Sequence, residues 1–308
     1  MKKVITITVT ILALCLSAGM FAACSSNDGN PSVSENPPAN NDNNPVDSPA
    51  PASDFDSSRR IAVFTREDGS GTRDAFASIT GVGDDMYEEA VVLTATSEIR
   101  SSVAGNPYAI GYVSSGSLND TVKALAIGGV MPSAETIISG RYPIQRPFLI
   151  VTNDEKDASS LVKDFIAFAL SAEGQEIASD GWTSAGNTGG YTPIGLSGTL
   201  RIGGSTSVDP LMQRLRAAYI ELNPNVSVEI SGGGSGTGIS EATSGVIDIG
   251  MSSRSLRDAE KEALNEYTIA LDGVVVIINN ANPVGDIDIE TVKDIFTGEK
   301  TAWSEIND

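Results

Sequence analysis

From Arg59 onward, short apolar runs rich in valine and isoleucine alternate with segments of helical periodicity. Strands are expected at Ile61–Phe64, Val91–Thr94, Ala109–Val113, Phe148–Thr152, Thr199–Gly203, Val226–Ile230, Val246–Ile249 and Gly273–Ile278. Helices are expected at Thr72–Ile79, Glu98–Ala104, Ser133–Ser139, Ala158–Ser171, Val208–Leu222 and Ile289–Phe296. In the fourth of these helices, Phe165 and Phe168 fall on one face, and Lys163 and Asp164 are expected to face away from it. This alternation predicts α/β architecture.

The sequence Gly-Ser-Gly-Thr occurs twice, each time between a predicted strand and a predicted helix. It lies in Thr65–Phe76 (TREDGSGTRDAF) and again in Ser231–Ser240 (SGGGSGTGIS). The first N–H groups of a helix lack partners within it and carry partial positive charge, while glycine lets an anion approach them. One such loop alone is commonly a turn that requires positive φ. Two of them, with Arg66 four residues before Ser70, favour two cradles closing on one small oxyanion.

Two further loops follow the same pattern at the ends of predicted strands. They are Gly203–Pro210 (GGSTSVDP) and Asp248–Arg254 (DIGMSSR). Each could also be an ordinary helix cap or a solvated loop. Hydroxyl donors at the ends of several strands lie where an open α/β sheet usually binds its ligand.

Composition excludes several classes of function. The formal charge is −20, and the chain has no histidine. Nucleic-acid binding needs a basic surface, so we expect none. Without histidine there is no Ser-His-Asp triad, no histidine-based zinc site and no imidazole base. We therefore predict a binding protein and not an enzyme, with no catalytic residue, no metal and no cofactor. The acidic pairs Asp84-Asp85 and Glu88-Glu89 are expected on solvated surface away from the four loops.

The first residues have the features of an export signal. Lys2 and Lys3 precede the apolar run Val4–Ala18, which is too short for a comfortable membrane span. We predict a signal peptide over residues 1–23.

Cys24 follows small residues, as at a bacterial lipoprotein cleavage site; an ordinary signal that happens to precede a cysteine is the alternative. Cys15 lies within the signal, so Cys24 would be the one cysteine of the mature chain. A lone exported thiol is unusual unless it is modified, which favours lipidation (palmitate included) at Cys24. Residues 24–58, rich in Asn, Pro, Ser and Asp, are predicted to be a lipidated, disordered tether to the cell membrane.

At the four loops the chain resembles the periplasmic phosphate-binding proteins of ABC phosphate transporters, the PstS type. Matching stretches continue elsewhere, in Ala109–Val113 (AIGYV), Val162–Ile177 (VKDFIAFALSAEGQEI), Val274–Pro283 (VVVIINNANP) and Asp294–Trp303 (DIFTGEKTAW). The resemblance implies a two-lobed, type II periplasmic-binding-protein-like fold that captures inorganic phosphate in a cleft between its lobes. It also implies an extracytoplasmic monomer that works with the permease subunits of an ABC importer. The alternative is an oxyanion sensor or adhesin on the same scaffold, not coupled to transport.

Carried over position by position, the resemblance implies a phosphate site made of Arg66, Ser70, Gly71, Thr72, Thr206, Ser207, Ser235 and Ser253. Arg66 would be the charged clamp, and an aromatic residue often stands in place of Ser207. Ser253 stands where some members have an aspartate that accepts the proton of bound phosphate. That acceptor is missing here, although a serine hydroxyl can also accept.

The order of the motifs departs from the family's, in which REDGSGT follows the stretch ending in TAW. Here REDGSGT comes first. The chain is then either a circular permutant, with the old termini joined through Gly195–Gly198, or a fragment of a tandem protein. We predict the permutant. Its predicted domains are lobe II, residues 59–145 with 273–308, and lobe I, residues 146–272. Its predicted hinge crossings lie near Arg146–Phe148 and Leu271–Val274.

Overall fold

The computed structural model describes residues 55–306. The predicted signal peptide, Cys24 and most of the predicted tether lie outside the described residues. Among the helices of residues 55–306, none is both long enough and apolar enough to cross a bilayer.

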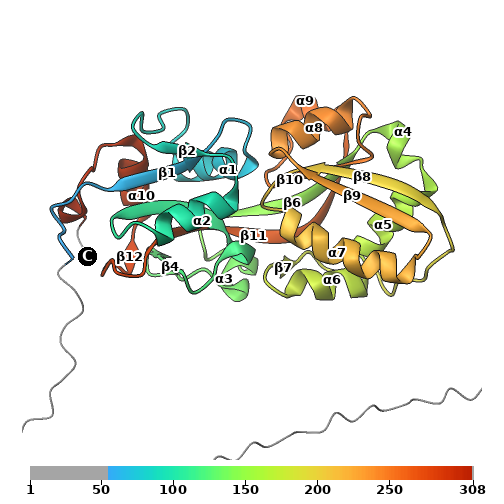
Figure 1. The fold of residues 1–308 in the computed structure, drawn as a ribbon, viewed down its shortest axis with the longest axis horizontal. Coiled ribbons are helices and arrows are strands. Elements are labelled where there is room, and N and C mark those ends of the chain that lie inside the picture. The colour runs from blue at the N-terminus through green and yellow to red at the C-terminus, as the bar shows by residue number, and fades with distance from the viewer. Residues whose placement is uncertain (1–54, 307–308) are drawn as a thin grey trace, which may run out of the picture. The chain divides into compact units, whose positions relative to one another are not determined.

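Two lobes share one sheet (Figure 1). The β1 lobe contains β1 (Ala62–Arg66), α1 (Gly71–Thr80), β2 (Val91–Leu93), α2 (Thr96–Ala104), β3 (Ala109–Ser114), η1 (Ser115–Ser117), β4 (Val122–Ala124), β5 (Ala126–Ile127), α3 (Ala134–Ile138), β12 (Asp286–Ile287), α10 (Ile289–Thr297) and η2 (Trp303–Glu305). The β8 lobe contains α4 (Asp154–Asp157), α5 (Ser160–Ala169), α6 (Ala172–Ser179), β7 (Thr183–Ser184), β8 (Gly198–Gly204), α7 (Asp209–Leu222), β9 (Val226–Gly232), α8 (Ser235–Thr243), β10 (Ile249–Ser252) and α9 (Asp258–Lys261). The strands β6 (Gln145–Thr152) and β11 (Asn265–Asn279) join the lobes.

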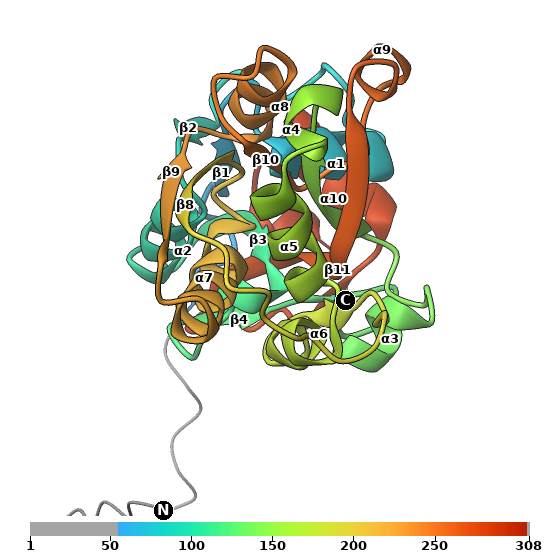
Figure 2. The ribbon, with the colours of Figure 1, turned by 90° about the vertical axis from the view of Figure 1, so that its right-hand side faces the viewer.

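The sheet runs in the order β2-β1-β3-β11-β6-β10-β8-β9. The first half of β11 pairs with β6 and its second half with β3, both antiparallel, and β10 is antiparallel to β6. Strands β8, β9 and β10 therefore run in the direction of β11, and β1, β2 and β3 run against it. It follows that the carboxyl ends of the parallel strands in one lobe face those in the other. In the β8 lobe, α5 and α7 pack on the same face of the sheet, where Phe165 and Tyr219 meet with ring centroids 5.0 Å apart, and α8 covers the other face (Figure 2).

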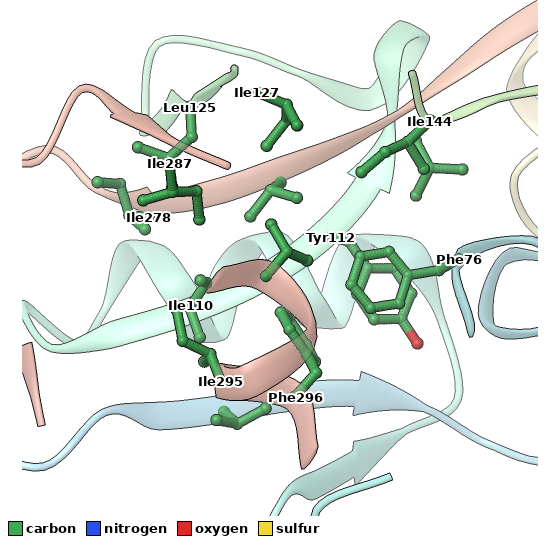
Figure 3. Close-up of a cluster of buried hydrophobic side chains, with 14 of the residues drawn as sticks. Phe76, Ile110, Tyr112, Leu125, Ile127, Ile144, Ile278, Ile287, Ile295 and Phe296 are labelled. Carbon is green, nitrogen blue, oxygen red and sulfur yellow. The ribbon is translucent and has the colours of Figure 1, made fainter. Parts of the chain in front are cut away.

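Each lobe has its own hydrophobic core. Phe76 of α1 stacks on Tyr112 of β3 with ring centroids 4.1 Å apart, and Phe296 of α10 meets Phe76 edge-on at 4.7 Å (Figure 3). All three side chains are fully buried. Aromatic pairs in these geometries add to the stabilisation from burial alone. This packing fixes α1 on the sheet and so fixes the loop that precedes it.

The sequence-based prediction for Asp164 is wrong. Asp164 does not face away from the core but is 7% exposed. Its Oδ2 accepts hydrogen bonds from the hydroxyls of Tyr191 and Tyr219, each at 2.7 Å. Burial raises the pKa of Tyr219, so this hydroxyl keeps its proton and donates it. A buried carboxylate is tolerated when it has such donors, and helical periodicity alone does not reveal them.

Several strand boundaries also differ from the predictions, and β6 begins at Gln145 and not at Phe148. The strand expected at Val246–Ile249 instead begins at Ile249, and Val246 is exposed. The strand expected at Gly273–Ile278 is the end of β11, which begins at Asn265. The first half of β11 is partly exposed, so Asn265–Tyr267 are not a run of apolar residues. For this reason the sequence did not indicate where the strand begins.

A buried ion pair lies where β6 and β11 pass between the lobes. Arg146 and Asp272 are paired across the two strands. The Arg146 Nε and Nη2 atoms donate to Asp272 Oδ2 at 3.0 and 2.8 Å. Asp272 Oδ1 accepts from the Ser114 hydroxyl and from the N–H and hydroxyl of Ser115. Burial raises the pKa of Asp272, and the Arg146 guanidinium and the serine donors oppose that rise.

We expect Asp272→Ala to lower the free energy of unfolding by about 3–5 kcal/mol, because it leaves the Arg146 charge buried without its partner. Urea denaturation measures this change. The control is Asp180→Ala, since Asp180 pairs with Arg214 on the surface with 86% of its side chain exposed, and about 0–1 kcal/mol is expected there. Equal losses in the two variants would contradict the role of the buried pair.

Candidate anion-binding site

Arg66 ends β1 and is held from several sides. It is 1% exposed. Its Nε and Nη2 atoms donate to the two oxygens of Glu67, both at 2.9 Å, and Nη1 donates to the Thr96 hydroxyl at 3.1 Å. A further bond runs from Nη2 to the Thr94 carbonyl at 3.1 Å. A guanidinium has five N–H donors, so these contacts leave one N–H of Nη1 for another acceptor.

The backbone around Arg66 is fixed by Tyr112. The Tyr112 hydroxyl accepts from the Arg66 N–H at 3.1 Å and shares a hydrogen bond with the Thr65 hydroxyl at 2.7 Å. Burial raises the pKa of Tyr112, which keeps its hydroxyl protonated. Sheet and core thus hold the arginine in one position.

The loop after Arg66 leads into α1. Ser70 is the N-cap of this helix, and its hydroxyl accepts from the Arg73 N–H. Gly71 and Thr72 are the first two residues of the helix, so their N–H groups have no acceptor within it and point out of its positive end.

In the β8 lobe, three loops bring serine side chains together. The Ser205 hydroxyl donates to the Ser253 hydroxyl at 2.9 Å, and the Ser253 N–H donates to the Ser235 hydroxyl at 3.0 Å. This approach depends on Gly238 in α8. A Cβ there would lie 2.6 Å from the Gly203 carbonyl oxygen, so a larger residue would push α8 off the sheet.

The loops of the two lobes are in direct contact. The Thr72 hydroxyl lies 2.7 Å from the Ser207 hydroxyl, and the Thr96 hydroxyl lies 3.0 Å from it. The Gly236 N–H donates to the Gly69 carbonyl at 2.9 Å. We call the six hydroxyl groups of Thr72, Thr96, Ser205, Ser207, Ser235 and Ser253 the hydroxyl cluster.

Gly71 marks a close approach between the lobes. A Cβ on Gly71 would lie 2.3 Å from Ser235 Oγ and 2.9 Å from Ser253 Oγ. No real side chain fits at such distances, so the contact requires glycine.

Of the eight residues predicted to form the site, the structure brings seven together. Arg66 reaches the cluster through Thr96, Ser70 caps the helix that carries Gly71 and Thr72, and Ser207, Ser235 and Ser253 face them. Thr206 differs, because its buried Oγ1 has no hydrogen-bond partner among residues 55–306.

Sequence reasoning missed two members of the hydroxyl cluster. Thr96 is the first residue of α2 and follows β2 closely. Like the other hydroxyls, it therefore lies between the end of a strand and the start of a helix, but its loop contains no glycine that would indicate this. Ser205 lies inside the GGSTS motif and was passed over for its neighbours.

The cluster offers donors and hydroxyl oxygens but no free carboxylate. Glu67 is the carboxylate bonded to Arg66, and both of its oxygens are engaged by that guanidinium. Within the described part of the chain, no group of three or more acidic or cysteine side chains could hold a metal ion. Such a set of donors is suited to an oxyanion.

Comparison with known proteins agrees with this fold. The model of a family described as "PBP superfamily domain" matches residues 42–173 and 189–308. Phosphate-binding protein PstS 2 of Streptococcus pneumoniae is 42% identical over 265 residues, which cover 83% of this chain and 90% of that protein. The PstS 2 protein of Streptococcus agalactiae is 40% identical over 258 residues, 80% of this chain and 88% of its own length.

A crystal structure of a phosphate-binding protein of a phosphate ABC transporter from Streptococcus pneumoniae TIGR4 superposes with a TM-score of 0.67. It is 41% identical and covers 80% of this chain and all of its own. These matches define a two-lobed binding protein. The chain belongs to the PBP superfamily domain family and, within it, to the phosphate-binding proteins of the PstS type. The resemblance stated from the sequence is confirmed.

We expect Gly71→Ala to keep the lobes apart, because its Cβ collides with Ser235 while alanine suits the first turn of a helix. Small-angle X-ray scattering should report a larger radius of gyration than for the native protein. The control is Gly285→Ala, since a Cβ at Gly285 meets no atom within 4 Å. If Gly71→Ala scatters like the control, the lobes do not need this contact.

Proposed function

We propose that the protein captures inorganic phosphate between its two lobes and delivers it to an ABC-type phosphate importer. The observation that carries this proposal is the meeting of Thr72 and Thr96 of one lobe with Ser207 of the other, beside the buried Arg66. Donors from both lobes at one place are what a binding protein needs if closure is to enclose its ligand.

Arg66, Ser70, Gly71, Thr72, Thr206, Ser207, Ser235 and Ser253 are the proposed phosphate-binding residues, to which we add Thr96 and Ser205. Phosphate loses its hydration shell on entering the site and regains hydrogen bonds from hydroxyl, amide and guanidinium donors. Micromolar affinity corresponds to about −8 kcal/mol. Several charge-assisted hydrogen bonds of roughly 1.5–3 kcal/mol each can exceed this value before ordering costs are subtracted.

The relatives support the choice of ligand. Two of them carry the name phosphate-binding protein, with identities of 42% and 40%. The superposed crystal structure is described as a phosphate-binding protein of an ABC transporter. All are named as binding proteins and none as an enzyme, which favours capture over catalysis.

We place the protein outside the cytoplasm, in keeping with a role in import. The predicted signal peptide at residues 1–23 and the predicted cleavage site before Cys24 favour export followed by lipid anchoring, with residues 24–58 as the tether. The partners on this proposal are phosphate and the permease subunits, and the working form is a monomer.

Circular permutation within the family is also a proposal. A phosphate-binding protein PstS of Bacillus subtilis is 34% identical over 113 residues, only 36% of this chain and 38% of its own length. The longer alignment with the streptococcal PstS 2 covers 90% of that protein. If the motif order of this chain differs from that of the Bacillus subtilis protein, only part of the two chains can be aligned in one continuous stretch. If the streptococcal PstS 2 has the same order as this chain, that alignment stays long. On this proposal, 59–145 with 273–308 and 146–272 are the two lobes.

We expect Arg66→Ala to weaken phosphate binding by about 2–5 kcal/mol, the cost of removing one partner from a buried charged contact. Isothermal titration calorimetry measures this loss. Arg60→Ala is the control, since Arg60 pairs with Glu89 on the surface with 65% of its side chain exposed. Phosphate affinity equal to that of the control would refute the role of Arg66, and no phosphate binding by the native protein would refute the function.

We expect sulfate to compete with phosphate in this site. The hydroxyl cluster has no free carboxylate to repel an unprotonated anion, so discrimination is limited to the roughly 1–3 kcal/mol of one unsatisfied hydrogen bond. This corresponds to a sulfate Kd about 5- to 150-fold above that of phosphate. Competition calorimetry tests it, and complete rejection of sulfate at millimolar concentration would contradict the expectation.

A further inference from the structure

A second contact between the lobes lies outside the hydroxyl cluster and is ionic. Asp74 of α1, in the β1 lobe, approaches two arginines of the β8 lobe. Its Oδ2 lies 2.9 Å from Arg254 Nε and 3.1 Å from Arg257 Nη2. The Arg254 Nε–H is not directed at the oxygen, so the first contact is an ion pair, whereas the Arg257 contact is a hydrogen bond.

Arg254 is held ready for this contact by its own lobe. Its side chain is 8% exposed. The Nη1 and Nη2 atoms donate to the two oxygens of Glu260 at 2.7 and 2.8 Å, and Nη1 also donates to the Ser255 carbonyl. A bidentate pair fixes the plane of the guanidinium. Arg254 thus presents its Nε edge to the other lobe without having to be ordered when the lobes meet.

The ionic contact is joined to the hydroxyl cluster through two short segments. Asp74 lies in the same helical turn as Thr72, and Arg254 is the residue after Ser253. Any motion that separates Gly71 from Ser253 therefore also separates Asp74 from Arg254. Thr72 and Asp74 belong to one rigid helix, and Ser253 and Arg254 are joined directly along the chain. We therefore expect the two contacts to open together.

We propose that Asp74, with Arg254 and Arg257, is a latch between the lobes that favours closure and slows release of the anion. The effect on release rests on the proposed function, whereas the effect on closure does not. The latch consists of one carboxylate and two guanidinium groups at a partly exposed position, so salt weakens it.

The sign of the effect separates a latch from simple electrostatics. Replacing Asp74 by asparagine removes a negative charge close to an anion site, and this change alone would tighten anion binding. Loss of a latch weakens binding instead. Asp68→Asn is the matched control, because Asp68 precedes the same helix and pairs only within its own lobe, with Arg73 at 2.9 Å and 95% of its side chain exposed.

The test compares the full native chain with Asp74→Asn and Asp68→Asn. Small-angle X-ray scattering without added anion measures the radius of gyration, which falls when the lobes close. Stopped-flow kinetics measures the rate of phosphate release. For Asp74→Asn we expect a larger radius of gyration and phosphate release about 3- to 10-fold faster, and for Asp68→Asn neither change. Arg257→Gln, at a side chain 69% exposed, should shift both readouts in the same direction by less.

Scattering and release rates that are the same in Asp74→Asn and Asp68→Asn would overturn the latch. Circular dichroism confirms that each variant is folded. If the native protein does not bind phosphate, the proposed function fails, but the scattering comparison still decides whether the ionic contact holds the lobes together.

Discussion

The pairing of β6 with β11 is the constraint on which the rest of the structure depends. These two antiparallel strands are the route by which the described chain passes between the lobes, and Gln145 lies opposite Gly273 in their register. Because the other strands of this sheet take their direction from them, the carboxyl ends of the parallel strands in the two lobes point at each other. Loops at those ends must then meet. The site is a consequence of strand direction before it is a consequence of any side chain.

The charges near the proposed site, and not the net charge of the whole chain, determine which ligand charge it favours. A formal charge of −20 would repel an anion if charge were spread evenly. At the site, however, Arg66 is hydrogen-bonded to a single carboxylate, that of Glu67, and the remaining donors are neutral hydroxyl and amide groups. Helix termini contribute partial positive charge without adding a side-chain charge. The net acidity then affects solubility and the rate of approach more than the chemistry of the site.

Much of this site could be predicted from sequence because glycine and serine at strand ends are conspicuous. The loops at Ser70, Ser207, Ser235 and Ser253 were found in this way. Thr96 was not, because its place in the site arises from the pairing of β2 beside β1, which is a long-range contact. The burial of Asp164 was not predicted for the same reason, since its hydrogen-bond partners Tyr191 and Tyr219 are distant from it in the sequence. Local patterns predict elements and their ends, whereas partners across the sheet need the fold.

Hydroxyl groups suit a site that has to close, for a reason that goes beyond anion binding. A lysine at each of these positions would bring like charges together across the lobes and oppose closure. Serine and threonine can both donate and accept, so Thr72 and Ser207 satisfy each other across the interface. The same hydroxyls can turn their protons toward an anion. Because Thr72 and Ser207 have a hydrogen-bond partner in either arrangement, the free energy of closure depends on the small difference between them, and a few contacts at the rim can shift it.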